Sequence, residues 1–309
     1  MTASSFPSAH YHVEQVSEGV YAALARLEGT AVCNSGIVDL GGGRLLFDSS
    51  CSPASAQDLS SLCQRALNGG PSLAAISHWH LDHSVGCYEL ASVPIWGTKR
   101  TREILLEMRP QLEAELTREE LEKGIQEIEG HRDEMKTDGA RLDLEFCLYY
   151  ARSLLAAAGR VKITPPSETF ETHLDLPGTR KATLASFGSG HTEADAVLFL
   201  PHEKLLFAGD LVISGVQPSL GSGNPDHWLE VLDQIDRIGA EQVVPGHGPV
   251  LRKDATHETR DYVSSVLRAA EVPATAALPL PIRRWEGSLS LKENLAFARG
   301  WVDSHRTGR

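Results

Sequence analysis

The sequence lacks an excess of basic residues and any long hydrophobic segment. Its 309 residues include 29 Lys and Arg against 41 Asp and Glu, which gives a formal net charge of −12. Nucleic acids and anionic membrane surfaces attract a basic face, so this balance argues against both as partners. No apolar run approaches the roughly 18 residues of a transmembrane helix. The first twenty residues show no basic start followed by an apolar stretch, which predicts no secretory signal and a cytoplasmic location.

Cysteines are few, odd in number and never spaced as C-x-x-C. This pattern argues against a disulfide framework and a thiolate zinc site, and it fits a reducing compartment. We expect most of them to be small buried hydrophobic residues, with Cys51 and Cys87 left open because they lie near the motifs described below. Glycine motifs of the G-x-G-x-x-G and Walker types are also lacking, so nucleotide chemistry has no support. The five cysteines are Cys33, Cys51, Cys63, Cys87 and Cys147.

Short apolar segments and helical segments follow one another in two halves of the chain. Apolar runs bounded by turn residues predict strands within residues 13–49, 72–77, 169–176, 181–187, 194–200, 204–208 and 242–244. Helical spacing predicts helices over 53–67, 224–238 and 255–270, the first of them capped by Ser52. With 41% hydrophobic residues the chain can bury a core. The order of elements predicts an α/β fold in which two sheets are stacked between layers of helices.

Residues 99–166 separate the two halves and are rich in Glu, Lys, Arg and Leu. A capping box at Thr117–Glu120 and a second helical stretch over 141–158 predict a pair of inserted amphipathic helices. The pair could pack together on the outer face of the domain, or it could form a lid or partner surface at the active-site cleft, which we favour. We predict one domain over residues 1–309, with the helical insertion at 99–166 and a C-terminal extension at 271–309.

The strand predicted over 72–77 runs directly into the sequence His78-Trp-His80-Leu-Asp82-His83. Residues two apart on an extended segment point the same way, so His78 and His80 can bind one metal ion together. Asp82 and His83 follow where a helix could start, and they would face a neighbouring position. Three imidazoles and a carboxylate within six residues are a ligand mixture typical of a divalent transition metal. Histidines on a solvated loop would rarely be so dense.

Three further segments each place one possible ligand directly after a glycine at the end of an apolar run. Glycine permits a sharp turn or a close backbone approach that a Cβ atom would hinder. One such segment is weak evidence, but three of them together with the histidine-rich motif are strong evidence for a metal centre. The candidate ligands are His191 after Gly190, Asp210 after Gly209 and His247 after Gly246.

On these motifs, residues 14–260 resemble the metallo-β-lactamase fold superfamily. The resemblance implies a four-layer αββα sandwich of two mixed sheets that holds two divalent metal ions. Asp48, at the end of a predicted strand, matches an acidic residue of the family that orients a ligand, and a role as cap of the following turn is an equal alternative. Seven residues match ligand positions of the family: His78, His80 and His191 for the first metal, Asp82, His83 and His247 for the second, and Asp210 as the carboxylate that bridges both.

The ligand identities also discriminate within the superfamily. Asp210 stands where some lactamases carry cysteine, and His80 stands where flavo-diiron oxidoreductases carry glutamate. The complete set resembles that of glyoxalase II, the quorum-signal lactonases and the RNA-processing phosphodiesterases. This implies a dinuclear metal-dependent hydrolase whose metal-bridging hydroxide attacks an ester, lactone, thioester or amide bond. Asp82 is the predicted catalytic residue that carries the proton to the leaving group.

Zinc is the predicted metal, although five His and two Asp are also acceptable to iron or manganese. The alternatives are a phosphodiesterase, an iron-dependent sulfur dioxygenase and a non-catalytic ligand-binding regulator on the same fold. The lack of a basic arm counts against the first, and the complete ligand set counts against the last. The predicted partner is a small-molecule substrate, and a homodimer is also open. The substrate itself is not identified, because specificity in such folds depends on loops and insertions.

Overall fold

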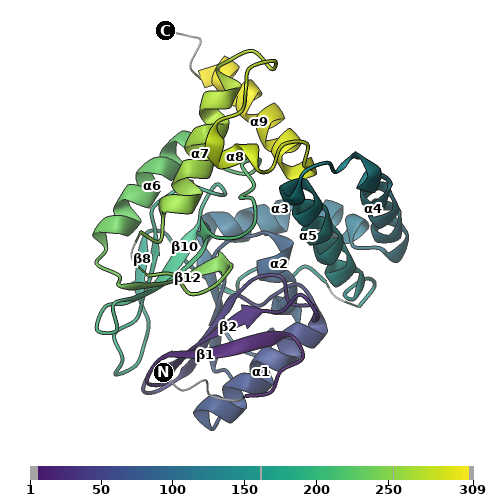
Figure 1. Cartoon of the computed structure of the whole chain (residues 1–309). Coiled ribbons are helices and arrows are strands. Elements are labelled where there is room, and N and C mark those ends of the chain that lie inside the picture. The colour runs from purple at the N-terminus through teal and green to yellow at the C-terminus, as the bar shows by residue number, and fades with distance from the viewer. Residues whose placement is uncertain (1–5, 161, 253, 306–309) are drawn as a thin grey trace.

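Two β-sheets lie face to face at the centre of the protein, and helices cover both outer faces (Figure 1). This computed structural model describes residues 6–160, 162–252 and 254–305. The ends of the predicted domain, residues 1–5 and 306–309, lie outside the described residues. Each sheet contains both parallel and antiparallel pairs. The predicted four-layer α/β sandwich of two mixed sheets is therefore confirmed.

The first sheet is antiparallel through β4 and parallel from β4 onward. Helix α1 (Pro53–Leu67) connects β4 to β5 and packs on the outer face. It begins as predicted, because the Ser52 hydroxyl accepts a hydrogen bond from the Ser55 amide and Pro53 stands in the first turn. In spatial order the strands are β1 (Tyr11–Ser17), β2 (Val20–Ala25), β3 (Ser35–Asp39), β4 (Arg44–Phe47), β5 (Leu73–Ala75), β6 (Ile95–Thr98) and β7 (Glu168–Phe170).

The second sheet is covered on its outer face by α6 (Pro225–Arg237) and α7 (His257–Ala270). The C-terminal extension adds α8 (Leu280–Arg283) and α9 (Leu289–His305), which join the same hydrophobic cluster. Strand β11 is buried at all nine positions, because it has the first sheet on one side and helices on the other. In spatial order the strands are β12 (Gln242–His247), β11 (Leu205–Ile213), β10 (Ala196–Leu200), β9 (Thr183–Ser186) and β8 (His173–Asp175).

The inserted block contains more helix than the sequence indicated. Helix α3 (Lys99–Glu115) was not predicted, because its many charges and Pro110 obscure the apolar positions. Its Leu105 and Leu112 nevertheless belong to the core beneath the first sheet. The two predicted helices are present as α4 (Arg118–Gly130) and α5 (Asp138–Leu155), with a short 3-10 turn η2 (Arg132–Glu134) between them. The expectation of a helix pair was wrong, and α3 makes part of the block a component of the main core.

Three strand predictions also need correction. The single strand expected over 169–176 is two strands, because β7 pairs with β6 in the first sheet and β8 pairs with β9 in the second. Strand β11 continues past residue 208 to Ile213, and β12 continues past residue 244 to His247. The β11–β12 register shifts around Gly209, whose φ of +51° suits glycine, so pairing resumes beyond this irregularity.

Two smaller expectations concern the cysteines and membrane segments. All five cysteines are free thiols, four of them buried and Cys147 half-buried, and this agrees with the preferred interpretation of small hydrophobic residues. Within the described ranges, none of the helices combines the length and the apolar character needed to cross a membrane.

Candidate metal centre

All seven predicted ligands meet at one edge of the two sheets. His78 and His80 follow β5, and Asp82 and His83 lie in the short helix α2 (Leu81–Ser84), which continues into the 3-10 turn η1 (Val85–Tyr88). The others come from the second sheet and its loops. The donor atoms form two groups, and within each group they lie within 4.8 Å of one another. The first group is His78, His80, His191 and Asp210, and the second group is Asp82, His83 and His247.

Asp210 lies between the two groups. Its Oδ1 is 3.1 Å from the Nε2 of His83, and its Oδ2 is 3.4 Å from the Nε2 atoms of both His191 and His247. Asp82 completes the second group, with its Oδ2 3.3 Å from His247 Nε2 and 3.6 Å from His83 Nε2. One carboxylate therefore faces donor atoms of both groups, which is the arrangement that a bridging ligand requires.

The outer nitrogens of three histidines are held by hydrogen bonds, and this leaves the inner nitrogens for the centre. His191 Nδ1 is 3.0 Å from the Ser219 carbonyl oxygen, and His247 Nδ1 is 3.1 Å from the Val32 carbonyl oxygen. Because a carbonyl only accepts, each Nδ1 donates, and each Nε2 points into the centre, where Asp210 Oδ2 lies 3.4 Å from both. His80 is turned the other way, since its Nε2 meets the Ser222 hydroxyl at 3.0 Å and its Nδ1 faces His191.

Asp48 orients a histidine of the second group. Its Oδ2 is 2.9 Å from His83 Nδ1, and it also accepts hydrogen bonds from the amide and the hydroxyl of Ser77. Asp48 is buried and has a φ of +62°, a conformation that non-glycine residues seldom adopt. Of the two alternatives for this residue, the contact to His83 favours orientation of the ligand over a cap of the turn.

Sequence reasoning missed two residues that support the ligands. The Ser77 hydroxyl lies between Asp48 and the Nδ1 atoms of His78 and His83. The buried Asp195 carboxylate accepts hydrogen bonds from the Gly190 amide and from the amide and hydroxyl of Thr192, so it fixes both neighbours of His191. Burial raises the pKa of Asp195 to about 7 despite these donors. A signal for Asp195 was present, because an Asp close after a Gly-His-Thr turn is well placed to bind the turn's amides.

Charge divides the two groups of histidines. Burial, together with the neighbouring imidazoles, lowers the pKa of His78 well below its usual value and that of His191 to about 3. Burial also acts against charge on His247, but Asp210 and Asp82 beside it raise its pKa to about 10. The pKa of His83 is likewise raised, because Cys33, Asp210 and other acidic groups outweigh its burial. The first group therefore presents neutral imidazoles, and the second group attracts positive charge.

These residues fit a pair of divalent cations. Among the described residues, His78 Nε2, His83 Nε2 and Asp210 Oδ1 are buried and make no hydrogen bond, although the last two atoms lie 3.1 Å apart. A buried polar atom without a partner is costly, and three of them aimed at one place indicate a missing ligand. Imidazole nitrogen with carboxylate oxygen is the donor set of zinc, and iron and manganese also accept it.

A buried network connects the C-terminal helix α9 to the loop that holds the first group. The Asn294 side chain accepts from the Leu220 amide at 2.9 Å and donates to the Pro218 carbonyl at 2.8 Å. These two residues flank Ser219, whose carbonyl accepts from His191. Asn294 also donates to the hydroxyl of Tyr262, so the network continues into α7.

We expect Asn294→Leu to weaken zinc binding in the first group by about 10- to 100-fold, because the loop that orients His191 loses the two hydrogen bonds on either side of Ser219. Zinc titration calorimetry measures the affinity, and Asn294→Asp, which keeps the acceptor for Leu220, should fall between the variant and the wild type. Leu291→Ala is the matched control. Leu291 is buried in the same helix, but its apolar side chain makes no hydrogen bond to the loop. Wild-type affinity in Asn294→Leu would contradict the prediction.

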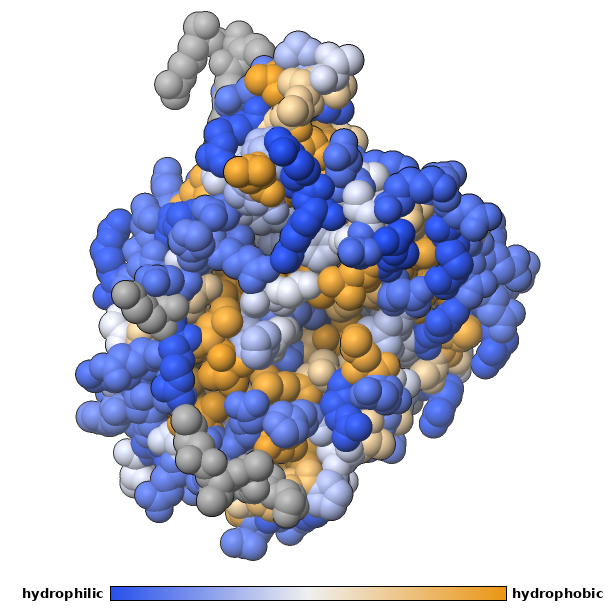
Figure 2. All heavy atoms as spheres, viewed as in Figure 1, coloured by the Kyte–Doolittle hydropathy of each residue, from blue (hydrophilic) through white to orange (hydrophobic). Residues whose placement is uncertain are grey.

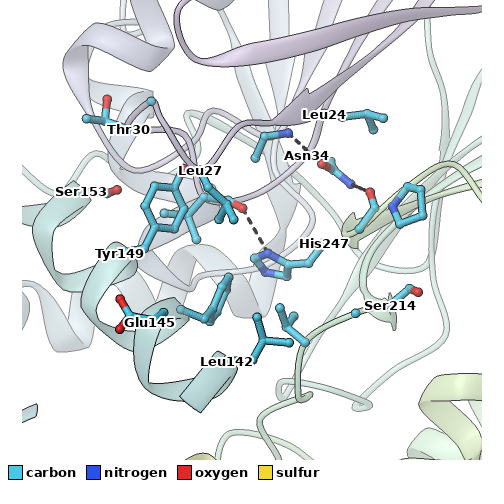
Figure 3. Close-up of a pocket in the computed structure, with 18 of the residues that line it drawn as sticks. Leu24, Leu27, Thr30, Asn34, Leu142, Glu145, Tyr149, Ser153, Ser214 and His247 are labelled. Carbon is cyan, nitrogen blue, oxygen red and sulfur yellow. Dashed lines mark hydrogen bonds between the residues drawn. The ribbon is translucent and has the colours of Figure 1, made fainter. Parts of the chain in front are cut away.

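A hollow of about 750 Å³ opens beside His247. Its walls are α5, the loop between β2 and β3, and residues 214–216 after β11. Figure 3 shows His247, Leu142 and Tyr149 around this space. Phe146 of α5 meets the His247 ring edge to face, with 5.6 Å between ring centroids. Of the two placements considered for the inserted block, the structure thus puts α5 next to the candidate metal centre, while none of the thirteen residues of α4 is buried.

The comparisons with known proteins agree with this geometry. A sequence profile described as the metallo-beta-lactamase superfamily matches residues 29–247. A search of curated proteins finds no match. The fold is similar to the DIM-1 metallo-beta-lactamase (18% identity, 82% of this chain and 97% of that one, TM-score 0.58) and to a metallo-beta-lactamase from Pontibacter korlensis (19%, 82% and 99%, 0.58). It is also similar to FIM-1 from Pseudomonas aeruginosa, in a mono-zinc form (17%, 85% and 97%, 0.58).

At 17–19% identity the structural likeness shows the fold alone. The sequence profile goes further, because it covers more than half of the chain and contains all seven candidate ligands. With its fold and its profile in agreement, the chain belongs to the metallo-beta-lactamase superfamily.

Proposed function

We propose that this protein is a dinuclear metal-dependent hydrolase that cleaves an ester, lactone, thioester or amide bond of a small molecule. The observation that carries the proposal is the meeting of two donor groups around Asp210, with unpartnered donor atoms of His78, His83 and Asp210 facing inward. We propose zinc as the metal, because imidazole and carboxylate together suit it. Two bound cations would supply Lewis-acid polarisation of a carbonyl oxygen and would lower the pKa of a water molecule.

The residues of the chain then divide the remaining tasks. Asp82 has the more accessible carboxylate of the two, with 10% of its side chain exposed against 7% for Asp210. We assign Asp82 to take the proton from the attacking water and deliver it to the leaving atom. Asp48, Ser77 and the Val32 carbonyl keep His83 and His247 in the orientation that faces Asp82.

The test is a hydrolysis screen on protein purified without added metal. Its metal content is measured first, and then esters, lactones, thioesters, β-lactams and phosphodiesters are assayed before and after treatment with a chelator. We expect turnover of at least one acyl substrate, loss of that activity on chelation and its return with zinc. Cleavage of phosphodiesters alone, or oxygen consumption by an iron-loaded protein, would overturn the proposal in favour of a different chemistry. A fully loaded protein inactive on the whole panel would argue for a binding role.

A further inference from the structure

The hollow beside His247 has apolar walls on three sides. The residues come from three separate segments of the chain, so the shape depends on the tertiary fold and not on one loop. In the space-filling view hydrophobic residues are visible in the middle of the face shown, with hydrophilic residues around them (Figure 2). The apolar residues that line the hollow include Leu24, Leu27, Leu142, Phe146, Val216 and Pro249.

The charged and amide side chains of the hollow already have partners. Arg152 donates to the Glu129 carboxylate at 2.6 Å, and Glu145 accepts from Arg132 at 2.5 Å. The side-chain amide of Asn34 is occupied by backbone groups. Its oxygen accepts from the Ala25 amide, and its nitrogen donates to the carbonyls of Pro245 and Gly248. The ion pairs of Arg152 and Glu145 are about half exposed to water, so a charged group entering the hollow would gain little free energy from them. An apolar group would instead gain free energy from leaving water.

The hollow is formed before any substrate enters. The Tyr149 hydroxyl of α5 shares its one proton between the carbonyl oxygens of Arg26 and Ala31 in the loop between β2 and β3. This contact connects two of the walls to each other. A rigid, preformed site loses little conformational entropy when a ligand binds.

The position of the hollow relates it to the proposed chemistry. His247 lines the hollow and is also 3.3 Å, through its Nε2, from Asp82 Oδ2. A substrate with its scissile carbonyl at the second group can therefore extend its substituent between Leu142 and Leu27. We propose that this hollow selects uncharged acyl substrates that carry a large apolar chain or ring. This inference rests on the proposed hydrolase function and names its substrate class.

The experiment compares the p-nitrophenyl esters of acetate, butyrate, hexanoate and octanoate. We expect kcat/KM to rise by up to about fourfold for each added methylene, until the hollow is filled. Leu142→Asp places a charge in the wall and should lower the octanoate-to-acetate ratio of kcat/KM at least about tenfold. Leu27→Asp makes the same test from the opposite wall, should the first variant fail to fold.

Leu106→Asp is the matched control. Leu106 of α3 is 49% exposed, against 50% for Leu142, and it does not line the hollow. It should keep the wild-type chain-length dependence. A flat wild-type series, or an unchanged dependence in Leu142→Asp and Leu27→Asp, would overturn the inference.

A binding measurement separates this inference from the proposed function. Octyl 4-nitrophenyl ether carries an eight-carbon alkyl chain like that of the octanoate ester but has no hydrolysable bond. Equilibrium dialysis measures its binding to the protein. If no member of the hydrolysis panel is cleaved but the ether binds the wild type and not Leu142→Asp, the hollow is an apolar binding site and the hydrolase proposal falls. If the ether binds neither the wild type nor Leu142→Asp while short esters are hydrolysed, the hydrolase function is kept and the proposed preference for apolar substrates is rejected.

Discussion

Asp210→Ala should bind one zinc ion per chain instead of two and should lose turnover by about 10³-fold or more, a larger loss than the 10- to 100-fold caused by removing a partner of a ligand. Both oxygens of Asp210 face donor nitrogens, one toward His83 and the other toward His191 and His247. Removing the carboxylate leaves those imidazoles without the group that holds the two sets of donors together. Elemental analysis of dialysed protein gives the stoichiometry, and steady-state kinetics gives the turnover.

A control for this experiment is Asp39→Ala. Asp39 is a half-buried carboxylate that accepts from the Gly41 amide in the turn between β3 and β4, and it lies outside both donor groups. This variant should keep two ions and wild-type turnover. The dinuclear proposal would not survive if wild-type protein with one metal ion per chain were fully active, or if Asp210→Ala retained both ions.

Zinc binding to the second group should release protons, whereas binding to the first group should release almost none. His83 and His247 have raised pKa values, the latter about 10, because the carboxylates of Asp82 and Asp210 favour their charged forms. In metal-free protein at pH 7 the His247 imidazole is therefore protonated and must lose a proton to bind zinc, and the raised pKa of His83 acts in the same direction. The logarithm of the second-group affinity should rise by at least about one per pH unit between roughly pH 7 and 9.

Calorimetric titration with zinc in two buffers of different ionisation enthalpy counts the released protons. His191→Ala isolates the second group, and His247→Ala isolates the first group. In the first group burial has already lowered the pKa values of His78, His80 and His191, so these imidazoles are neutral before zinc arrives. Equal proton release from the two isolated groups would contradict this division.

The same shifts have a consequence for the stability of metal-free protein. A histidine with a raised pKa contributes fully to the free energy of unfolding below the unfolded value of about 6.5, and the contribution is lost as the pH rises through the folded value. For His247 this window extends to about pH 10. The melting temperature of metal-free protein should therefore fall between pH 7 and pH 10, and Asp82→Asn should reduce the fall because it removes one source of the shift.

The parts of the fold that local sequence determines were predicted closely. The helix starting at Pro53 and the helix starting after Thr117 begin where their caps predicted, because a capping hydroxyl and its amide lie three residues apart. The ligand candidates were recognisable because four of them lie within six residues and the other three each follow a glycine. Short-range patterns such as these do not need the tertiary structure to be known.

The features that depend on distant contacts were not predictable from the chain. Helix α3 carries Pro110 and many charges, and its apolar residues can be recognised as core residues only once their packing in the core of the first sheet is known. The split of 169–176 into β7 and β8 depends on which sheet each half joins. The bonds of Asn294 to Pro218 and Leu220 join residues more than 70 positions apart, and nothing near Asn294 in the sequence indicates them.

The helix α5 has a consequence for how the protein can change over evolutionary time. All seven candidate ligands lie outside residues 99–166, while α5 within that block forms one wall of the hollow. Leu142, Glu145 and Tyr149 can therefore be replaced without altering any residue that would hold a metal ion. On the proposed function, single substitutions along one helix would change substrate preference, while the candidate metal centre is inherited unchanged and the range of accepted molecules diverges between descendants.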